Sequence, residues 1–253
     1  MTLDNFQLQG RTAIVTGCNK GLGQGMAIAL AQAGADIVGI NSSAPDQTCG
    51  IVESFGRRFL DLRANLADTH GLEELVNMSL ALTGKIDILV NNAGTIRRTD
   101  AIDFSEKDWD DVINLNLKNV FFLSQAVARQ FIRQGTGGKI INIASMLSFQ
   151  GGVRVPSYTA SKSGVIGITR ALANEWATRG INVNAIAPGY MATDNTAALQ
   201  ADPDRNAAIL ARIPANRWGL PDDMAGPVVF LASSASNYVH GHTLAVDGGW
   251  LAR

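Results

Sequence analysis

Tyr158 and Lys162 stand four residues apart, and Ser145 lies thirteen residues before the tyrosine. If this segment is helical, the phenol and the ammonium lie on one face, within reach of a shared ligand. A phenol has an ordinary pKa of about 10, and a neighbouring cation favours the phenolate and lowers that pKa. Tyr158 is therefore predicted to act as a general acid or base. The pair alone also fits a half-buried ring beside a solvated charge, so the prediction needs support from elsewhere in the chain.

A glycine-rich segment near the N-terminus supplies that support. The apolar stretch 11–15 predicts a strand, and residues 22–33, with Ala, Leu, Ile and Met at helical spacing, predict a helix. Gly17, Gly21 and Gly23 lie at this junction. Glycines in such a turn let backbone N–H groups and the positive end of a helix dipole approach a pyrophosphate. The sequence thus predicts a dinucleotide site to accompany the proton-transfer group.

Further apolar strand candidates alternate with helical stretches. They are residues 36–40, 58–62, 86–90, 139–144, 182–186 and 243–246. Such alternation predicts a parallel sheet with helices on both faces. The 253 residues contain no proline-rich linker, low-complexity block or internal repeat that would divide them. We therefore expect one α/β domain, 1–253, with a doubly wound parallel sheet of about seven strands.

Residues 191–220 differ from the rest of the chain because they are polar and rich in alanine, and they contain Pro203 and Pro214. They follow the strand candidate 182–186. Open α/β sheets bind ligands at the carboxyl ends of their strands, so this segment is predicted to cover a substrate. An ordinary pair of surface helices is the alternative.

The motifs of this chain resemble those of the short-chain dehydrogenase/reductase family in order and spacing, over essentially the whole length. They are Thr16-Gly17-x-x-x-Gly21-x-Gly23, Asn91-Asn92-Ala93-Gly94, Asn116, Ser145 with Tyr158-x-x-x-Lys162, and Pro188-Gly189. The resemblance implies a single-domain Rossmann fold and an oligomer, which we expect to be a homotetramer.

The resemblance also implies roles for the matching residues. In the catalytic set, Ser145 would hold the reacting oxygen, Tyr158 would exchange its proton, and Lys162 would bind the nicotinamide ribose. Asn116 would hold a water that connects Lys162 to solvent. The cofactor would contact the glycine turn and the ends of several strands, at Gly17, Asn19, Lys20, Gly21, Leu22, Gly23, Asn41, Asn65, Leu66, Asn92, Ala93, Gly94, Tyr158, Lys162, Pro188, Gly189, Met191 and Thr193.

The residues expected near the adenosine end of the cofactor leave the choice between NAD and NADP open. An acidic residue at the end of the second strand commonly binds the ribose hydroxyls of NAD, and positive charge there suits NADP. Asn41 occupies that position and supplies neither charge. Lys20, just before Gly21, could meet a 2'-phosphate or could simply be solvated. Asn65 also departs from the aspartate of many relatives. The resemblance favours NAD, and NADP stays a possibility.

Segments 94–98, 145–157, 187–192 and 246–253 resemble family members that act on deoxy sugar acids in pectin breakdown. An arginine fork suits the carboxylate of such a substrate, and Arg97, Arg98 and Arg154 are the candidates. Gln150 is a further candidate to line the pocket.

The predicted function is therefore NAD-dependent interconversion of a keto group and a secondary alcohol on 2-dehydro-3-deoxy-D-gluconate or 2-deoxy-D-gluconate. One alternative is an NADP-dependent reductase of another carbonyl, on gluconate or on an acyl carrier protein. A non-catalytic nucleotide sensor is the other, and the intact catalytic set argues against it.

Composition excludes several other classes of function. The net charge is -1 at pH 7 and the basic residues are scattered, so we expect neither nucleic acid nor an anionic membrane as a partner. Only two cysteines occur, with no signal-peptide pattern and no apolar run that could cross a bilayer, which favours the cytoplasm. The three histidines form no metal-ligand pattern, so no metal site is expected.

Overall fold

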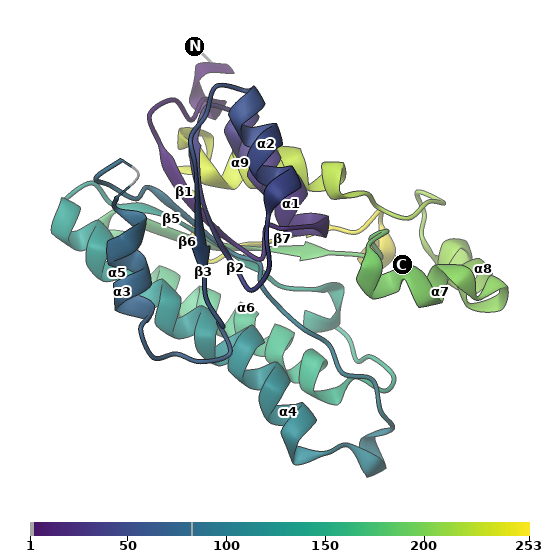
Figure 1. The fold of residues 1–253 in the computed structure, drawn as a ribbon. Helices are drawn as coiled ribbons and strands as arrows, with labels where there is room; N and C mark the ends of the chain where they lie inside the picture. Colours follow the sequence, from purple (N-terminus) through teal and green to yellow (C-terminus); the bar gives the residue numbers. More distant parts are fainter. Residues whose placement is uncertain (1–2, 82) are drawn as a thin grey trace.

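A parallel sheet of seven strands runs through the middle of the molecule in the computed structural model, which describes residues 3–81 and 83–253 (Figure 1). The strands are β1 (Thr12–Thr16), β2 (Asp36–Asn41), β3 (Phe59–Arg63), β4 (Ile88–Asn91), β5 (Gly138–Ile143), β6 (Ile181–Pro188) and β7 (Thr243–Val246). Their order is β3-β2-β1-β4-β5-β6-β7, and every neighbouring pair is parallel. This confirms the predicted doubly wound Rossmann fold, with strand ends within two residues of those expected.

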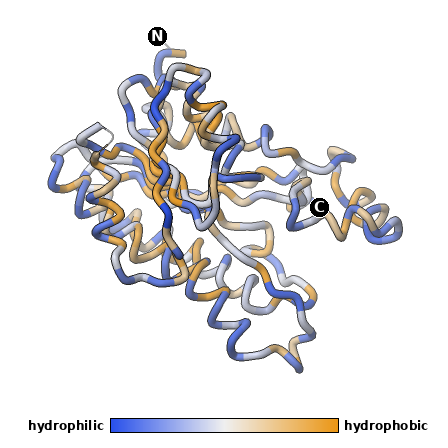
Figure 2. Tube along the Cα trace, viewed as in Figure 1, coloured by the Kyte–Doolittle hydropathy of each residue, from blue (hydrophilic) through white to orange (hydrophobic). Residues whose placement is uncertain are grey.

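Helices cover both faces of the sheet. One layer holds α1 (Gly21–Gln32), α2 (Asp46–Ser54) and α9 (Ala225–Ala232), and the other holds α3 (Leu72–Ser79), α4 (Glu106–Ile113), α5 (Asn119–Gln134) and α6 (Pro156–Trp176) (Figure 1). Each layer buries its own apolar cluster against the strands, with Met26 and Leu30 on one side and Leu123 and Phe131 on the other. Because both faces are covered, every residue of β1 is buried, and the centre of the sheet is largely hydrophobic (Figure 2), with polar exceptions such as Lys139 and Asn142 in β5.

The 191–220 segment stands apart from these layers. Its helices α7 (Ala197–Ala201) and α8 (Pro203–Arg212) lie beyond the carboxyl end of β6 (Figure 1). Helix α8 begins where Asp202 accepts hydrogen bonds from the backbone N–H groups of residues 204 and 205, with Pro203 at the first helical position. Met191 and Gly219 form a parallel bridge, so the segment leaves the domain and returns to it at one place.

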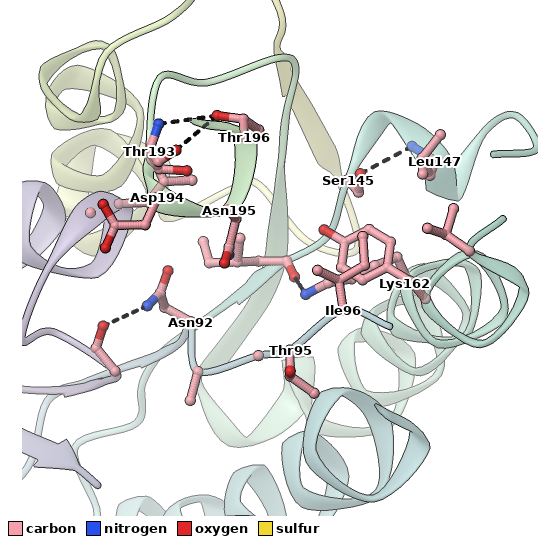
Figure 3. A pocket seen from close by; sticks show the side chains of 18 of the residues that line it. Asn92, Thr95, Ile96, Ser145, Leu147, Lys162, Thr193, Asp194, Asn195 and Thr196 are labelled. Atoms are coloured by element: carbon pink, nitrogen blue, oxygen red, sulfur yellow. Dashed lines mark hydrogen bonds between the residues drawn. The ribbon is translucent and has the colours of Figure 1, made fainter. Parts of the chain in front are cut away.

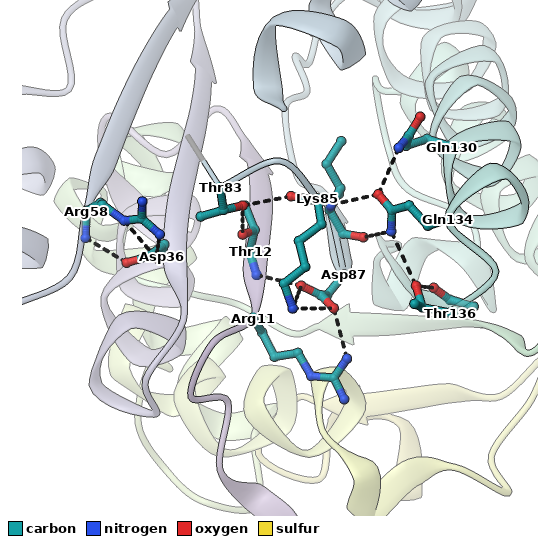
Figure 4. A network of polar contacts seen from close by, with 12 residues as sticks. Arg11, Thr12, Asp36, Arg58, Thr83, Lys85, Asp87, Gln130, Gln134 and Thr136 are labelled. Carbon is teal, nitrogen blue, oxygen red and sulfur yellow. Dashed lines mark hydrogen bonds and ion pairs between the residues drawn. The ribbon is translucent and has the colours of Figure 1, made fainter. Parts of the chain in front are cut away.

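Polar contacts close the opposite end of the sheet (Figure 4). Asp87 accepts hydrogen bonds from the Arg11 guanidinium and the Thr12 backbone N–H, both at 2.9 Å, and also pairs with Lys85. These contacts fasten the start of β1 to the turn before β4. The carboxyl ends of the strands, at the other edge, are left to bind ligands. Within the described ranges, none of the helices combines the length and apolar character that a membrane span needs.

Candidate active site

A cavity of about 1060 Å³ opens at the carboxyl ends of the central strands. It lies beside β1 and β4, where the strand order reverses, which is the usual ligand position in an open α/β sheet. Its size is at the upper end of small-molecule sites, so it can hold a dinucleotide with a small second ligand.

The glycine turn forms one wall of this cavity. Gly17 adopts φ +64°, and a Cβ on Gly23 would lie 2.1 Å from the Gly17 carbonyl oxygen. The Asn92 side chain donates to the carbonyl oxygens of Thr16 and Gly17 at 2.9 and 3.0 Å and so holds the turn closed. Lys20, at the N-cap of α1, makes no side-chain cap hydrogen bond, so the first N–H groups of the helix lack a side-chain partner. This arrangement fits a pyrophosphate.

The end of the cavity beside β2 is where Rossmann folds bind the adenosine ribose. Asn41 is buried there, and its Oδ1 accepts a hydrogen bond from the Cys18 N–H at 2.7 Å. Burial raises the pKa of the Cys18 thiol to about 11, so it stays protonated. Of the described residues that line this end, Lys20 alone is cationic, and its Nζ pairs with Asp194 at 2.7 Å.

Ser145, Tyr158 and Lys162 line the same cavity, and Figure 3 shows Ser145 and Lys162 there. Ser145 follows β5, while Tyr158 and Lys162 lie one turn apart on α6. Burial raises the pKa of the half-buried Tyr158 phenol, whereas a hydrogen bond with Ser145 and the positive charge of Arg98 oppose that rise. The Ser145 hydroxyl and the Arg98 charge therefore both favour the phenolate form of Tyr158.

The lowering of the phenol pKa by Lys162 stays a prediction, because the ammonium has another partner in this structure. The Lys162 Nζ donates to the Ile143 carbonyl oxygen at 2.6 Å and lies 5.7 Å from the centroid of the Tyr158 ring. Burial lowers the pKa of the ammonium itself to about 8. Arg98, in the loop after β4, is a cation that opposes the rise in the phenol pKa.

Asn116 lies in a π-helical turn (Asn114–Lys118) between α4 and α5, a feature frequent at functional sites. Its buried side chain exchanges two hydrogen bonds with the backbone of Thr95, at 2.8 and 2.9 Å, and donates to the Ser161 hydroxyl at 3.3 Å. It does not line the cavity. Asn116 therefore fastens the loop after β4 to the helix that carries Tyr158, and the water relay stays a prediction.

Comparison with known proteins identifies the family. The family described as enoyl-(acyl carrier protein) reductase matches residues 17–251. The chain belongs to the short-chain dehydrogenase/reductase family. It is an NAD(P)-dependent oxidoreductase that acts on CH–OH groups.

Its relatives share the whole length of the chain. A 2-dehydro-3-deoxy-D-gluconate 5-dehydrogenase from Dickeya dadantii is 69% identical over 253 residues, and one from Escherichia coli is 68% identical, each covering all of both chains. A crystal structure named as a 2-deoxy-D-gluconate 3-dehydrogenase from Agrobacterium tumefaciens, with NADP bound, is 54% identical. It covers 99% of this chain and 100% of its own, with a TM-score of 0.92.

The cavity of this dehydrogenase brings together most of the predicted cofactor residues. Pro188 and Met191 do not line it. Pro188 is the last residue of β6, and the buried Met191 side chain packs in the core beside Gly219. The predicted residues that do line it are Gly17, Asn19, Lys20, Gly21, Leu22, Gly23, Asn41, Asn65, Leu66, Asn92, Ala93, Gly94, Tyr158, Lys162, Gly189 and Thr193.

Of the three arginines predicted to bind the substrate of this dehydrogenase, two line the cavity and one does not. Arg97 does not line the cavity, because it pairs with Asp108 at 3.3 Å and Asp111 at 3.4 Å on the other side of the loop. Arg98 and Arg154 both line it. Arg98 donates to the backbone oxygen of residue 195 at 3.0 Å, and Arg154 pairs with the carboxylate of residue 100 at 2.8 Å. The expectation that Arg97 reaches the substrate is therefore not met.

Sequence reasoning missed much of the substrate side of this dehydrogenase. The 191–220 segment and the C-terminal turn contribute residues that carry no motif, since their contacts depend on how distant elements fold together. The sequence offers one local signal in this segment: Asp202 followed by Pro203 is typical of a helix start, and α8 begins there. The additional lining residues include Ser42, Ser43, Thr95, Ile96, Leu147, Tyr190, Asp194, Asn195, Thr196, Leu199, Asp202, Arg205, Arg212 and Trp250.

Proposed function

We propose that this chain is an NAD-dependent dehydrogenase that interconverts a keto group and a secondary alcohol on a deoxy sugar acid, with 2-dehydro-3-deoxy-D-gluconate as its substrate. The observation that carries the proposal is one cavity whose lining combines a pyrophosphate cradle, Ser145 with Tyr158, and several arginines. The names of the relatives at 69% and 68% identity support the substrate. We place the reaction in hexuronate and pectin breakdown in the cytoplasm, and the enzyme as a homotetramer.

The chemistry at the reacting oxygen follows from three side chains. When bound, the nicotinamide ring supplies or accepts the hydride. Ser145 holds the substrate oxygen, and Tyr158 removes the proton during oxidation and returns it during reduction. The Arg98 charge stabilises the phenolate that oxidation requires. The cavity thus provides a general acid and base with a nearby counter-charge.

Lys162 and Asn116 support this proton transfer. An ammonium has three donors, and the Ile143 carbonyl uses one of those on Lys162, which leaves donors for the ribose hydroxyls of the cofactor. Asn116 fixes the backbone of Thr95 and holds a relay water close to Lys162. Both residues are positioned by buried hydrogen bonds, so their geometry is set before any ligand binds.

The 191–220 segment covers the substrate. Two contacts draw its first turn across the cavity, from Lys20 to Asp194 and from Arg98 to the backbone of Asn195. These contacts come from two different walls, the glycine turn and the loop after β4. A cover of this kind excludes water from the reacting atoms and strengthens the electrostatic interactions beneath it.

NAD is the cofactor that the ribose end of the cavity favours. Asn41 already uses its side-chain oxygen on the Cys18 N–H, and Asp194 holds Lys20. No other cation among the described lining residues of 17–23, 40–43 and 64–66 stands ready for a 2'-phosphate. The NADP bound to the Agrobacterium relative makes NADP the second candidate, and the exposed hydroxyls of Ser42 and Ser43 would then meet the phosphate.

The test is the absorbance of the reduced-nicotinamide band with purified protein. The substrates are 2-dehydro-3-deoxy-D-gluconate and its 2,5-diketo product, with D-gluconate and a 3-oxoacyl thioester as comparators, each with NAD(H) and NADP(H). We expect the highest kcat/KM with the deoxy sugar acid and NAD(H). A higher value with gluconate or the thioester would replace the proposed substrate. NADH binding without any turnover would favour the sensor.

A further inference from the structure

Three side chains from separate parts of the chain meet on the wall of the cavity. Arg212 is the last residue of α8, and its guanidinium lies over the Trp250 ring, 4.0 Å from the centroid. Its Nη2 donates to the Gln150 Oε1 at 3.3 Å. All three residues line the cavity. The guanidinium at the end of α8 is thus held by a ring on one face and by an amide at one edge.

This arrangement leaves the guanidinium prepared for an anion. Stacking on a ring occupies a face of the guanidinium and leaves its in-plane N–H donors free. Gln150 uses one of those donors, and no carboxylate within residues 3–81 and 83–253 pairs with Arg212. The remaining edge matches the two oxygens of a carboxylate.

The base of the arrangement is fixed near the catalytic serine. Trp250 is 4% exposed and packs with Met146, the residue after Ser145, together with Ile209 and Ile213 of the 191–220 segment. Tyr190 meets the Trp250 ring edge-on at 4.8 Å between centroids. Arg212 is therefore one aromatic ring away from the wall that holds the reacting oxygen, at a suitable position for the far end of a short substrate.

The other arginines of the cavity suit the carboxylate less well. Arg154 already has the carboxylate of Asp100 at 2.8 Å. A substrate carboxylate against Arg98 would neutralise the charge that opposes the rise in the Tyr158 pKa. Arg205 projects from the same helix as Arg212 with no aromatic ring to orient it. Arg212 is the cation that could bind the substrate without cost to the chemistry.

We propose that Arg212, stacked on Trp250 and oriented by Gln150, binds the carboxylate of the substrate when the 191–220 segment covers the cavity. The proposal rests on the proposed function for the identity of the substrate, and it adds the residues that recognise the acid group. It also gives a role to the cation at the end of α8, the longest helix of the covering segment. A substrate bound to Arg212 would join this segment to the rest of the cavity wall.

The experiment replaces Arg212 by methionine, which keeps a flexible apolar contact with Trp250 and removes every donor. We expect KM for 2-dehydro-3-deoxy-D-gluconate to rise about ten- to a hundred-fold, the loss typical of charge-assisted hydrogen bonds. The Kd for NADH stays unchanged. Arg179→Met is the matched control, because Arg179 is exposed and does not line the cavity, so the variant removes the same charge away from the site. We expect its KM to stay within about twofold of the wild type.

A binding measurement separates this proposal from the proposed function. D-gluconate and the neutral D-glucitol are titrated by calorimetry into the protein–NADH complex of the wild type and of both variants. Loss of gluconate binding in Arg212→Met alone supports the carboxylate site even if no sugar acid is turned over. Unchanged gluconate binding and unchanged KM in Arg212→Met would overturn it, as would equal losses in Arg179→Met.

Discussion

The cofactor half of the cavity, beside β1 and β2, is built around the glycine turn, whereas the half beneath α7 and α8 carries the charged side chains of Asp194, Asp202, Arg205 and Arg212. In the first half, Gly17 and Gly23 approach so closely that no Cβ fits on Gly23, and the half-buried Asn92 amide holds the turn. In the second half, the contacts are ion pairs and single hydrogen bonds of exposed side chains, such as Lys20 with Asp194. Steric contacts determine the shape of the first half, whereas the shape of the second half depends on polar interactions that water can replace.

This difference matches what each half must do. Exposed ion pairs contribute little to stability, about 0–1 kcal/mol, so the contacts that hold the first turn of the 191–220 segment can open and close at little cost. The root of the segment is firmer, because Ile209 and Ile213 pack against Met146 and Trp250. A rigid cofactor cradle and a cover with an apolar root and a polar edge allow the substrate to exchange while the nucleotide keeps its position.

Tyr158→Phe removes the proposed proton donor, which needs cofactor and substrate bound in the two halves of the cavity. We expect the largest effect from this variant. Loss of a general acid or base costs about 10²–10⁴-fold in kcat. The Kd for NADH and the KM for the sugar acid should change little, because the ring remains in place. Stopped-flow turnover and fluorescence titration with NADH check both points. Turnover within tenfold of the wild type would assign the proton transfer to another group.

Gly23→Ala breaks the cofactor half alone. The new Cβ would lie 2.1 Å from the Gly17 carbonyl oxygen and 2.4 Å from the Asn92 Nδ2, so the turn must open. Overpacking of this kind costs about 1–3 kcal/mol, which corresponds to a fall of about 3–10 °C in Tm for a chain of this length. We also expect the Kd for NADH to rise more than about tenfold, since the amides that meet the pyrophosphate shift.

Gly50→Ala is the matched control for this variant. A Cβ on Gly50, in the exposed helix α2, has no neighbour within 4 Å, and alanine favours the helix. Scanning calorimetry and NADH titration should find Tm equal or slightly higher and the Kd unchanged. Similar losses in both variants would mean that the close approach at Gly23 does not define the cradle.

The same contrast explains how much the sequence reveals. The strands could be predicted because buried parallel strands are apolar runs, and the glycine turn because its residue types meet a local steric need. Arg212 and Gln150 are 62 residues apart, and nothing local indicates that they meet. Arg97 and Arg98 are neighbours with the same charge, yet one pairs with α4 and the other enters the cavity. Their partners are decided by tertiary packing.

Arg98→Met tests how the charged half influences the chemistry. Arg98 opposes the burial that raises the Tyr158 pKa, so its removal raises that pKa further. Oxidation needs the phenolate, and kcat for oxidation therefore rises with pH through this pKa. We expect the rising limb of the pH profile to move to higher pH, with kcat reduced at pH 7 and recovered at alkaline pH.

Arg97→Met is the control for this shift, since Arg97 pairs with Asp108 and Asp111 away from the cavity. Its pH profile should match that of the wild type. A profile that is lowered equally at every pH in Arg98→Met would assign Arg98 to holding Asn195 and the covering segment, rather than to tuning the phenol.

Asp194→Asn addresses the contact that joins the two halves, and we expect the smallest effect from it. The neutral amide releases Lys20, which is then free to meet a 2'-phosphate at the ribose end of the cavity. Because the pair is exposed, the affinity for NADPH should rise only about two- to fivefold, with the Kd for NADH nearly constant. Asp204→Asn, in α8 and without an ion pair among the described residues, should change neither affinity. Lys20→Met in the otherwise native chain completes the comparison. If it weakens NADPH binding tenfold, Lys20 already meets the phosphate, and the two halves of the cavity are coupled through the cofactor instead of through Asp194.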